Sequence, residues 1–87
     1  MAVLSVSVVS ASHEVWTGEA KQVVARTVEG QIGILAGHEP LLAILANGEV
    51  RITLENGEKI VAQADGGFLS VEHNSVSIVA GAASLVG

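Results

Sequence analysis

Apolar and polar residues alternate along most of the chain in short runs. In residues 3–10, for example, Leu4 and Val6 lie on one side of an extended chain, while Ser5 and Ser7 lie on the other. A period of two is typical of a β-strand with one buried face. Further strand-like runs occupy residues 15–17, 19–28, 31–35, 50–55, 58–64, 68–71 and 76–80. No run keeps the period of 3.6 that a helix requires, so the pattern predicts an all-β chain.

Short turn signals separate these runs. Asn47-Gly48 and Asn56-Gly57 are dipeptides that favour hairpins. At the second of them we expect a type I′ turn, with positive φ at both residues. Gly18 is expected to end the strand that contains Trp16. Trp16 itself is interpreted as an anchor of the core or, alternatively, of an interface.

Hairpin spacing throughout the chain sets the expected architecture. About eight to ten short strands predict an antiparallel β-sandwich, or flattened barrel. We assign residues 1–81 to this β-sandwich domain. Residues 82–87 are small and apolar, and we expect them to form a frayed C-terminal tail.

The stretch over residues 29–42, EGQIGILAGHEPLL, interrupts the alternation with glycines, a histidine and the single proline, Pro40. Proline cannot sit inside a central strand. Residues 41–46 that follow, LLAILA, are apolar at every position, which predicts burial on both sides. In a two-layer domain, one of those sides must meet something beyond the nearest sheet. We therefore interpret this stretch as an interaction surface, and the rest of the chain as the scaffold that supports it.

The composition adds a reason to expect a partner. A single domain of 87 residues buries only about 60% of its unfolded surface. Yet 49% of the residues are hydrophobic and the mean hydropathy is +0.56. Some apolar surface is therefore expected to face a partner. The alternative is a compact sandwich filled by many small alanine and valine side chains.

Charge and cysteine content exclude several classes of function. The net charge is −5 with four basic residues, which argues against nucleic-acid binding and against an anionic membrane surface. No cysteine is present, so no disulfide framework is expected. No apolar run approaches the roughly 18 residues of a membrane span, and no signal peptide is visible. We expect a soluble intracellular protein without direct membrane insertion.

Candidate chemistry is sparse. His13, His38 and His73 are scattered along the chain and lack supporting carboxylates, so no metal site is expected. The glycines of the central stretch are not followed by a Gly-Lys-Ser/Thr motif, so they form no phosphate-binding loop. We expect no catalytic residue, no cofactor and no small-molecule substrate. The alternative function is a small β-barrel carrier or ligand-binding module. However, Lys59 lies between Glu58 and Ile60 rather than beside the methionine of a carrier motif.

Taken together, several motifs carry a family resemblance. The central stretch EGQIGILAGHEPLL, with VVSA and VWTG before it and NGEVRI, GGFL and VSIVA after it, resembles the epsilon subunit of the rotary (F-type) ATP synthase. The resemblance extends from Val8 to Ala80. It implies a β-sandwich on the central stalk, non-catalytic, that binds the gamma subunit and the membrane rotor ring of c subunits. Such a subunit couples proton flow to ATP synthesis, as a peripheral protein on the cytoplasmic face of the bacterial plasma membrane.

The resemblance also implies which residues contact each partner. The expected ring-side residues are Glu29, Gly30, Gln31, Ile32, Gly33 and His38. The expected gamma-side residues are Glu39, Pro40, Leu41, Leu42 and Leu45. Many relatives carry an acidic residue where this chain has Gln31, so Glu29 is expected to supply the charge.

Length is a second departure from the family. Relatives usually continue into a C-terminal helical hairpin that inhibits ATP hydrolysis and in some cases binds ATP. The sequence ends at Gly87, where that hairpin would begin. We therefore expect neither inhibition nor ATP sensing by that route. The tail shows no helix start, which favours a naturally short form over a shortened one.

Overall fold

The computed structural model describes residues 3–11 and 13–86, and over these residues the chain forms ten β-strands and no helix. The strands are β1 (Leu4–Ser10), β2 (Glu14–Ala20), β3 (Gln22–Thr27), β4 (Gly30–Leu35), β5 (Leu41–Ile44), β6 (Gly48–Thr53), β7 (Lys59–Asp65), β8 (Phe68–Glu72), β9 (Ser75–Ala80) and β10 (Ala82–Leu85). The prediction of an all-β sandwich is confirmed.

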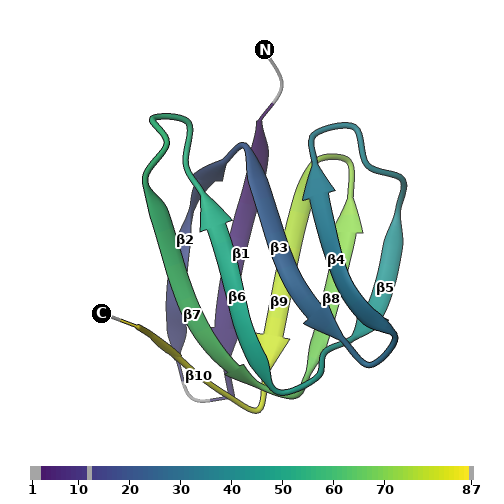
Figure 1. Cartoon of the computed structure of the whole chain (residues 1–87), viewed down its shortest axis with the longest axis vertical. Helices are drawn as coiled ribbons and strands as arrows, with labels where there is room; N and C mark the ends of the chain where they lie inside the picture. The colour runs from purple at the N-terminus through teal and green to yellow at the C-terminus, as the bar shows by residue number, and fades with distance from the viewer. Residues whose placement is uncertain (1–2, 12, 87) are drawn as a thin grey trace.

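The strands form two five-stranded sheets that face each other (Figure 1). Sheet A has the strand order β2-β1-β9-β8-β5, and sheet B has the order β10-β7-β6-β3-β4. Most neighbours are antiparallel, but β1 and β9 are parallel from Ser5↔Ser75 to Ser10↔Ala80. This pair is the one exception to the predicted antiparallel pairing among the strand pairs of the described residues. The alternation of apolar and polar residues, with turn signals between the runs, predicts hairpins between strands that are adjacent in sequence. It does not predict the pairing of β1 with β9, which are far apart in the sequence.

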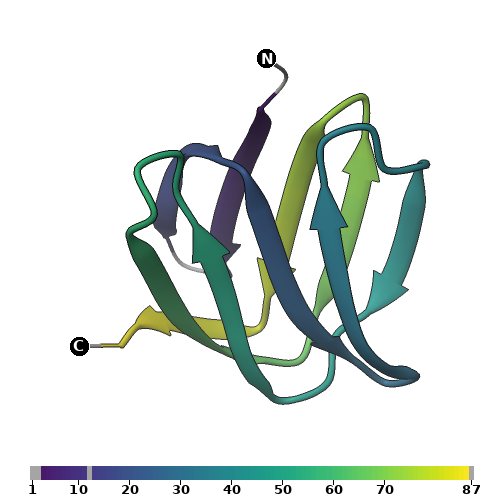
Figure 2. The ribbon, with the colours of Figure 1, turned by 45° about the horizontal axis from the view of Figure 1, so that its top comes forward.

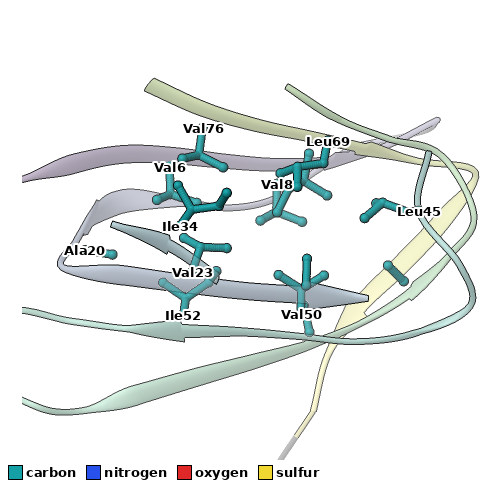
Figure 3. Close-up of a cluster of buried hydrophobic side chains, with 14 of the residues drawn as sticks. Val6, Val8, Ala20, Val23, Ile34, Leu45, Val50, Ile52, Leu69 and Val76 are labelled. Atoms are coloured by element: carbon teal, nitrogen blue, oxygen red, sulfur yellow. The ribbon is translucent and has the colours of Figure 1, made fainter. Parts of the chain in front are cut away.

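The alternating residues predicted to be buried fill the space between the sheets (Figure 3). Both layers contribute, with Val6, Val8 and Leu69 from sheet A facing Val23 and other residues of sheet B. Each such side chain contributes about 1.5–3 kcal/mol through burial. The buried apolar residues are Leu4, Val6, Val8, Ala20, Val23, Ala25, Ile34, Leu45, Val50, Ile52, Ala62, Ala64, Leu69, Val71, Val76, Ile78 and Ala80.

Strand β5 is not buried on both sides, contrary to expectation. Leu42 and Ile44 are 71% and 55% exposed, whereas Leu45, just after the strand, is buried at 3%. The reason is that sheet A packs against sheet B on one face only, so the other face of β5, as of every strand in sheet A, points to solvent. Apolar residues on that outer face are therefore left without a covering layer.

The Asn47-Gly48 signal does not form a hairpin. Strand β5 pairs with β8 in sheet A, and β6 pairs with β7 and β3 in sheet B. The intervening segment crosses from one layer to the other (Figure 2). Its backbone groups bind both layers, since Leu45 N donates to Gly67 O and Ala46 N donates to Arg26 O, each at 2.9 Å. An Asn-Gly pair favours a change of direction but does not fix the strand that follows.

The β6–β7 hairpin also differs in its turn. Gly57 has a φ of 91°, but Asn56 does not have positive φ, so the expected type I′ turn is wrong. Gly57 N donates to Leu54 O at 3.0 Å, which is typical of a three-residue loop ending in a left-handed glycine. Positive φ at two successive residues instead occurs at His73 and Asn74, in the tight loop between β8 and β9.

The predictions for Gly18 and for the C-terminal tail are also wrong. Strand β2 continues through Gly18, where an added Cβ would lie 2.8 Å from the Trp16 ring. Gly18 therefore makes room for Trp16, which packs against the core, and it does not end the strand. In the expected tail, residues 82–85 form β10 and pair with β7 from Ala82↔Asp65 to Leu85↔Ala62. Alternation there was hidden because small residues occupy both faces.

Candidate interaction surfaces

The turn between β3 and β4 projects from the sandwich, and hydrogen bonds to Thr27 hold its conformation. Thr27 is a buried polar residue whose Oγ1 donates to Gly30 O at 2.8 Å and accepts a hydrogen bond from Glu29 N at 3.1 Å. Gly30 has a φ of 128°, which disfavours any residue with a side chain. The turn therefore holds Val28 and Glu29 exposed at its tip. Of the predicted ring-side residues, those from 29 to 33 lie here.

The loop between β4 and β5 contains His38, Glu39 and Pro40 at the other end of β4. His38 Nδ1 lies 2.7 Å from Glu39 O, and because a carbonyl oxygen only accepts, Nδ1 carries the proton. His38 N also donates to Leu35 O at 3.1 Å. The His38 ring is therefore hydrogen-bonded to the backbone of its own loop.

The predicted ring-side set does not form one cluster. Glu29 and His38 are separated by the length of β4, and Figure 1 shows their loops at opposite ends of the sandwich. In the predicted gamma-side set, Leu45 is wrong as a contact residue because its side chain lies in the core. Leu41 is partly buried, while Leu42 is exposed on β5.

The strand registers reveal a surface that the sequence prediction missed. Ile44 pairs with Phe68, Phe68 pairs with Val79, and Val79 pairs with Val9. These four residues form a continuous line across β5, β8, β9 and β1 on the outer face of sheet A, which we call the apolar row. Ile44, Phe68 and Val79 are 55%, 54% and 44% exposed. Contiguous exposed apolar residues mark an interaction site in a soluble protein.

The outer face of sheet B has a different character. Arg26, Glu49 and Arg51 lie there around a polar hollow of about 280 Å³ that Gln31 also lines. Arg51 makes an ion pair with Glu49 at 3.2 Å. Lys59, the residue considered for a carrier function, begins β7 and does not occupy the tip of its hairpin. Around this hollow sheet B therefore presents charged and polar groups, whereas sheet A presents the apolar row.

A groove connects the β3–β4 turn with β5. It encloses about 240 Å³ and is lined by Thr27, Val28, Glu29, Ile32 and residues 41–44. Val28 N donates to Ile44 O at 3.0 Å, and Thr27 forms an isolated bridge with Leu45. The turn and the apolar row are therefore parts of one hydrogen-bonded unit at this corner.

Neither a metal centre nor a membrane span is found in the described part of the chain. Within residues 3–11 and 13–86, no group of three or more histidine or acidic side chains could hold a metal ion. The same residues contain no helix that is long and apolar enough to cross a membrane.

Comparison with known sequences gives a consistent family. The family described as "ATP synthase, Delta/Epsilon chain, beta-sandwich domain" matches residues 3–86. The ATP synthase epsilon chain of Micrococcus luteus is 51% identical over 85 residues, which cover 98% of this chain and 93% of that protein. The epsilon chain of Frankia casuarinae is 49% identical over 82 residues, covering 94% and 96%. For the epsilon chain of Streptomyces avermitilis the identity is 48%, and 66% of its length is covered.

Solved structures show the same architecture. A chain in the Euglena gracilis mitochondrial ATP synthase, in a structure of its OSCP/F1/c-ring, superposes with a TM-score of 0.91 at 28% identity. The match covers 98% of this chain and 54% of the Euglena chain. A chain in the central stalk and c-ring of the Tetrahymena thermophila mitochondrial ATP synthase gives a TM-score of 0.74 at 19% identity, which shows the shared fold alone.

Proposed function

Because this chain belongs to the β-sandwich family of ATP synthase delta and epsilon chains, we propose that it is a central-stalk, or rotor, subunit of a proton-translocating ATP synthase. As an epsilon chain it is a non-catalytic accessory subunit of a membrane-associated complex. In the proposed role it binds the gamma subunit and the membrane rotor ring, and so couples proton flow to ATP synthesis. The bacterial sources of its relatives support a site on the cytoplasmic face of the plasma membrane.

The apolar row is the observation that carries this proposal. A soluble protein gains little by exposing Ile44, Phe68 and Val79 in one continuous line, whereas a docked subunit would cover them. Covering a half-exposed side chain of this size contributes about 1 kcal/mol. We assign the apolar row, with Leu42 beside it on β5, to the gamma subunit. Glu39 and Pro40 adjoin this strand and are assigned to the same contact.

The β3–β4 turn is assigned to the rotor ring. It projects Val28 and Glu29 from the end of the sandwich opposite His38 (Figure 1). The family resemblance implies ring loops with basic side chains, and the exposed carboxylate of Glu29 is complementary to such loops. Gln31, the second residue of β4, is exposed and adds an uncharged contact. His38 is too far along β4 to join this contact, and we assign it to the gamma side.

Titration of this protein against purified gamma subunit tests the proposal. We expect saturable one-to-one binding without metal or nucleotide, measured as heat and as a change in Trp16 fluorescence. Binding of gamma would support the stalk role. A mixture that stays unbound at micromolar concentrations of both proteins would contradict the gamma assignment.

A further inference from the structure

Beyond the apolar row, the outer face of sheet A contains an open hollow. It measures about 270 Å³ and lies over β1, β2 and the start of β9. Its surface is mainly apolar, with hydroxyl groups and one carboxylate among the residues that line it, which are Ser5, Val6, Ser7, Thr17, Gly18, Glu19 and Ser75. Short serine side chains on β1 and β9 leave this space, and the longer residues of β2 form its wall.

The strand registers fix where the hollow lies relative to the apolar row. Ser5 pairs with both Ser75 and Glu19, and Ser75 also pairs with Glu72. This line runs parallel to the apolar row and is four residues away along β1, from Val9 to Ser5. At about 3.3 Å per residue, the two lines are separated by about 13 Å. Glu19 and Glu72 are the acidic residues of this second line, whereas Glu14, the exposed partner of Val9 on β2, places one further carboxylate beside the apolar row.

Charge on this face is uncompensated. In the described part of the chain, the strands of sheet A contain no lysine or arginine, and the one ion pair joins Arg51 to Glu49 on sheet B. Lys21, two residues beyond Glu19, has already joined the other layer, where its N donates to Thr53 O at 2.9 Å. A partner that covers sheet A would therefore bury Glu19 beside hydroxyl oxygens without a cation, unless the partner supplies one.

We propose that this hollow receives one lysine or arginine side chain of the gamma subunit and thereby fixes the orientation in which gamma covers the apolar row. The inference rests on the proposed function, since it concerns the same face. Ammonium and guanidinium groups are donors without acceptors, and the hollow offers hydroxyl and carboxylate oxygens to match them. The basic side chain lies about 13 Å from the apolar contact on gamma, as the strand spacing requires.

A matched pair of variants tests the charge. E19Q removes the carboxylate at the hollow, and E55Q removes one negative charge from an exposed residue of the β6–β7 loop. We expect gamma to bind E19Q about tenfold more weakly than wild type in low salt, and E55Q about as tightly as wild type. The deficit of E19Q should shrink as salt is raised from about 0.05 M to about 0.3 M. Equal affinities of E19Q and E55Q would overturn the inference.

A second variant tests the space. S5L fills the hollow without changing charge, on an exposed residue whose substitution leaves the core intact. We expect S5L to weaken gamma binding, because the basic side chain loses its place. Normal binding of S5L would overturn the location of the contact, even if E19Q were weak. Failure of the wild-type protein to bind gamma would overturn the proposed function together with this inference, so the two failures are distinguishable.

Discussion

The backbone N–H of Gly37 donates a hydrogen bond of 2.6 Å to Oδ1 of Asn74. This bond ties the β4–β5 loop to the turn between β8 and β9. Asn74 also accepts a hydrogen bond from Ser5 N through its backbone oxygen, at 2.8 Å. One residue in a left-handed conformation, with a φ of 61°, thus joins three segments at one end of sheet A. The loop that contains His38 is positioned by this contact.

Replacement of Asn74 should separate its two contributions. In N74A the amide is lost and alanine must adopt positive φ, so we expect the free energy of unfolding to fall by about 2 kcal/mol. In N74G the amide is lost but positive φ is tolerated, so a fall of about 1 kcal/mol is expected. Urea unfolding followed by Trp16 fluorescence measures both values. Equal losses in the two variants would show that backbone strain at this position is negligible.

The apolar row predicts a loss of binding without a loss of stability. F68S removes an exposed aromatic side chain from the centre of the row, and we expect gamma to bind at least tenfold more weakly. The melting temperature should stay close to that of wild type, because Phe68 points away from the core. L35S is the matched control, since Leu35 is 57% exposed on β4 of sheet B. A binding loss as large in L35S as in F68S would contradict the assignment of gamma to sheet A.

Trp16 and Gly18 predict a steric effect on stability. An added Cβ at Gly18 would lie 2.8 Å from the ring atoms Cη2 and Cζ2 of Trp16, so G18A must displace the indole. We expect the free energy of unfolding to fall by about 1–3 kcal/mol, with a shift in the tryptophan emission maximum. G33A is the control, because a Cβ at Gly33 meets no atom closer than 3.9 Å. An unchanged emission spectrum in G18A would mean that the ring is not packed over this glycine.

The β6–β7 hairpin predicts unequal effects at its two turn residues. Gly57 has a φ of 91°, so G57A should cost about 1 kcal/mol or more. Asn56 Oδ1 accepts a hydrogen bond from Glu58 N at 2.9 Å, so N56A should cost about 0.5–1 kcal/mol through loss of that bond. Thermal unfolding of both variants gives the comparison. A larger loss in N56A than in G57A would support the type I′ turn that the structure does not have.

Strand positions were predictable from the sequence because the core selects one face of each strand. The apolar row was not predictable from the sequence, although two pairs of adjacent apolar residues indicate that some strands have apolar residues on both faces. Val8-Val9 and Ile78-Val79 are pairs of adjacent apolar residues, and in each pair the first lies in the core while the second points outward. Such a pair shows that a strand carries an extra apolar residue. It does not show that the extra residues align, because alignment depends on the parallel pairing of β1 with β9.

In the candidate site, too, local features were predictable from the sequence and long-range positions were not. The turn at Glu29 and Gly30 was predictable because a turn needs glycine and exposes its polar residues, which are local properties. The family resemblance grouped His38 with them, but β4, an intervening strand of six residues, puts it at the other end of the sandwich. Leu45 was taken for a contact because it continues an apolar run. After β5 the chain passes from sheet A to sheet B, and this change of layer buries Leu45. The residue types in the apolar run do not indicate where that change occurs.

Glu29 provides the sharpest test of the rotor-ring contact. Its backbone N is held by Thr27 Oγ1, but no hydrogen bond of its side chain stabilises the described structure. E29K should therefore change the free energy of unfolding by less than about 0.5 kcal/mol. At the proposed contact the same change replaces attraction to basic ring loops by repulsion, so ATP-driven proton pumping by the reassembled complex should fall. E55K makes the same charge change in the β6–β7 loop and should pump normally. Normal pumping by E29K would remove this residue from the ring contact, and equal defects in both variants would indicate a general effect of net charge.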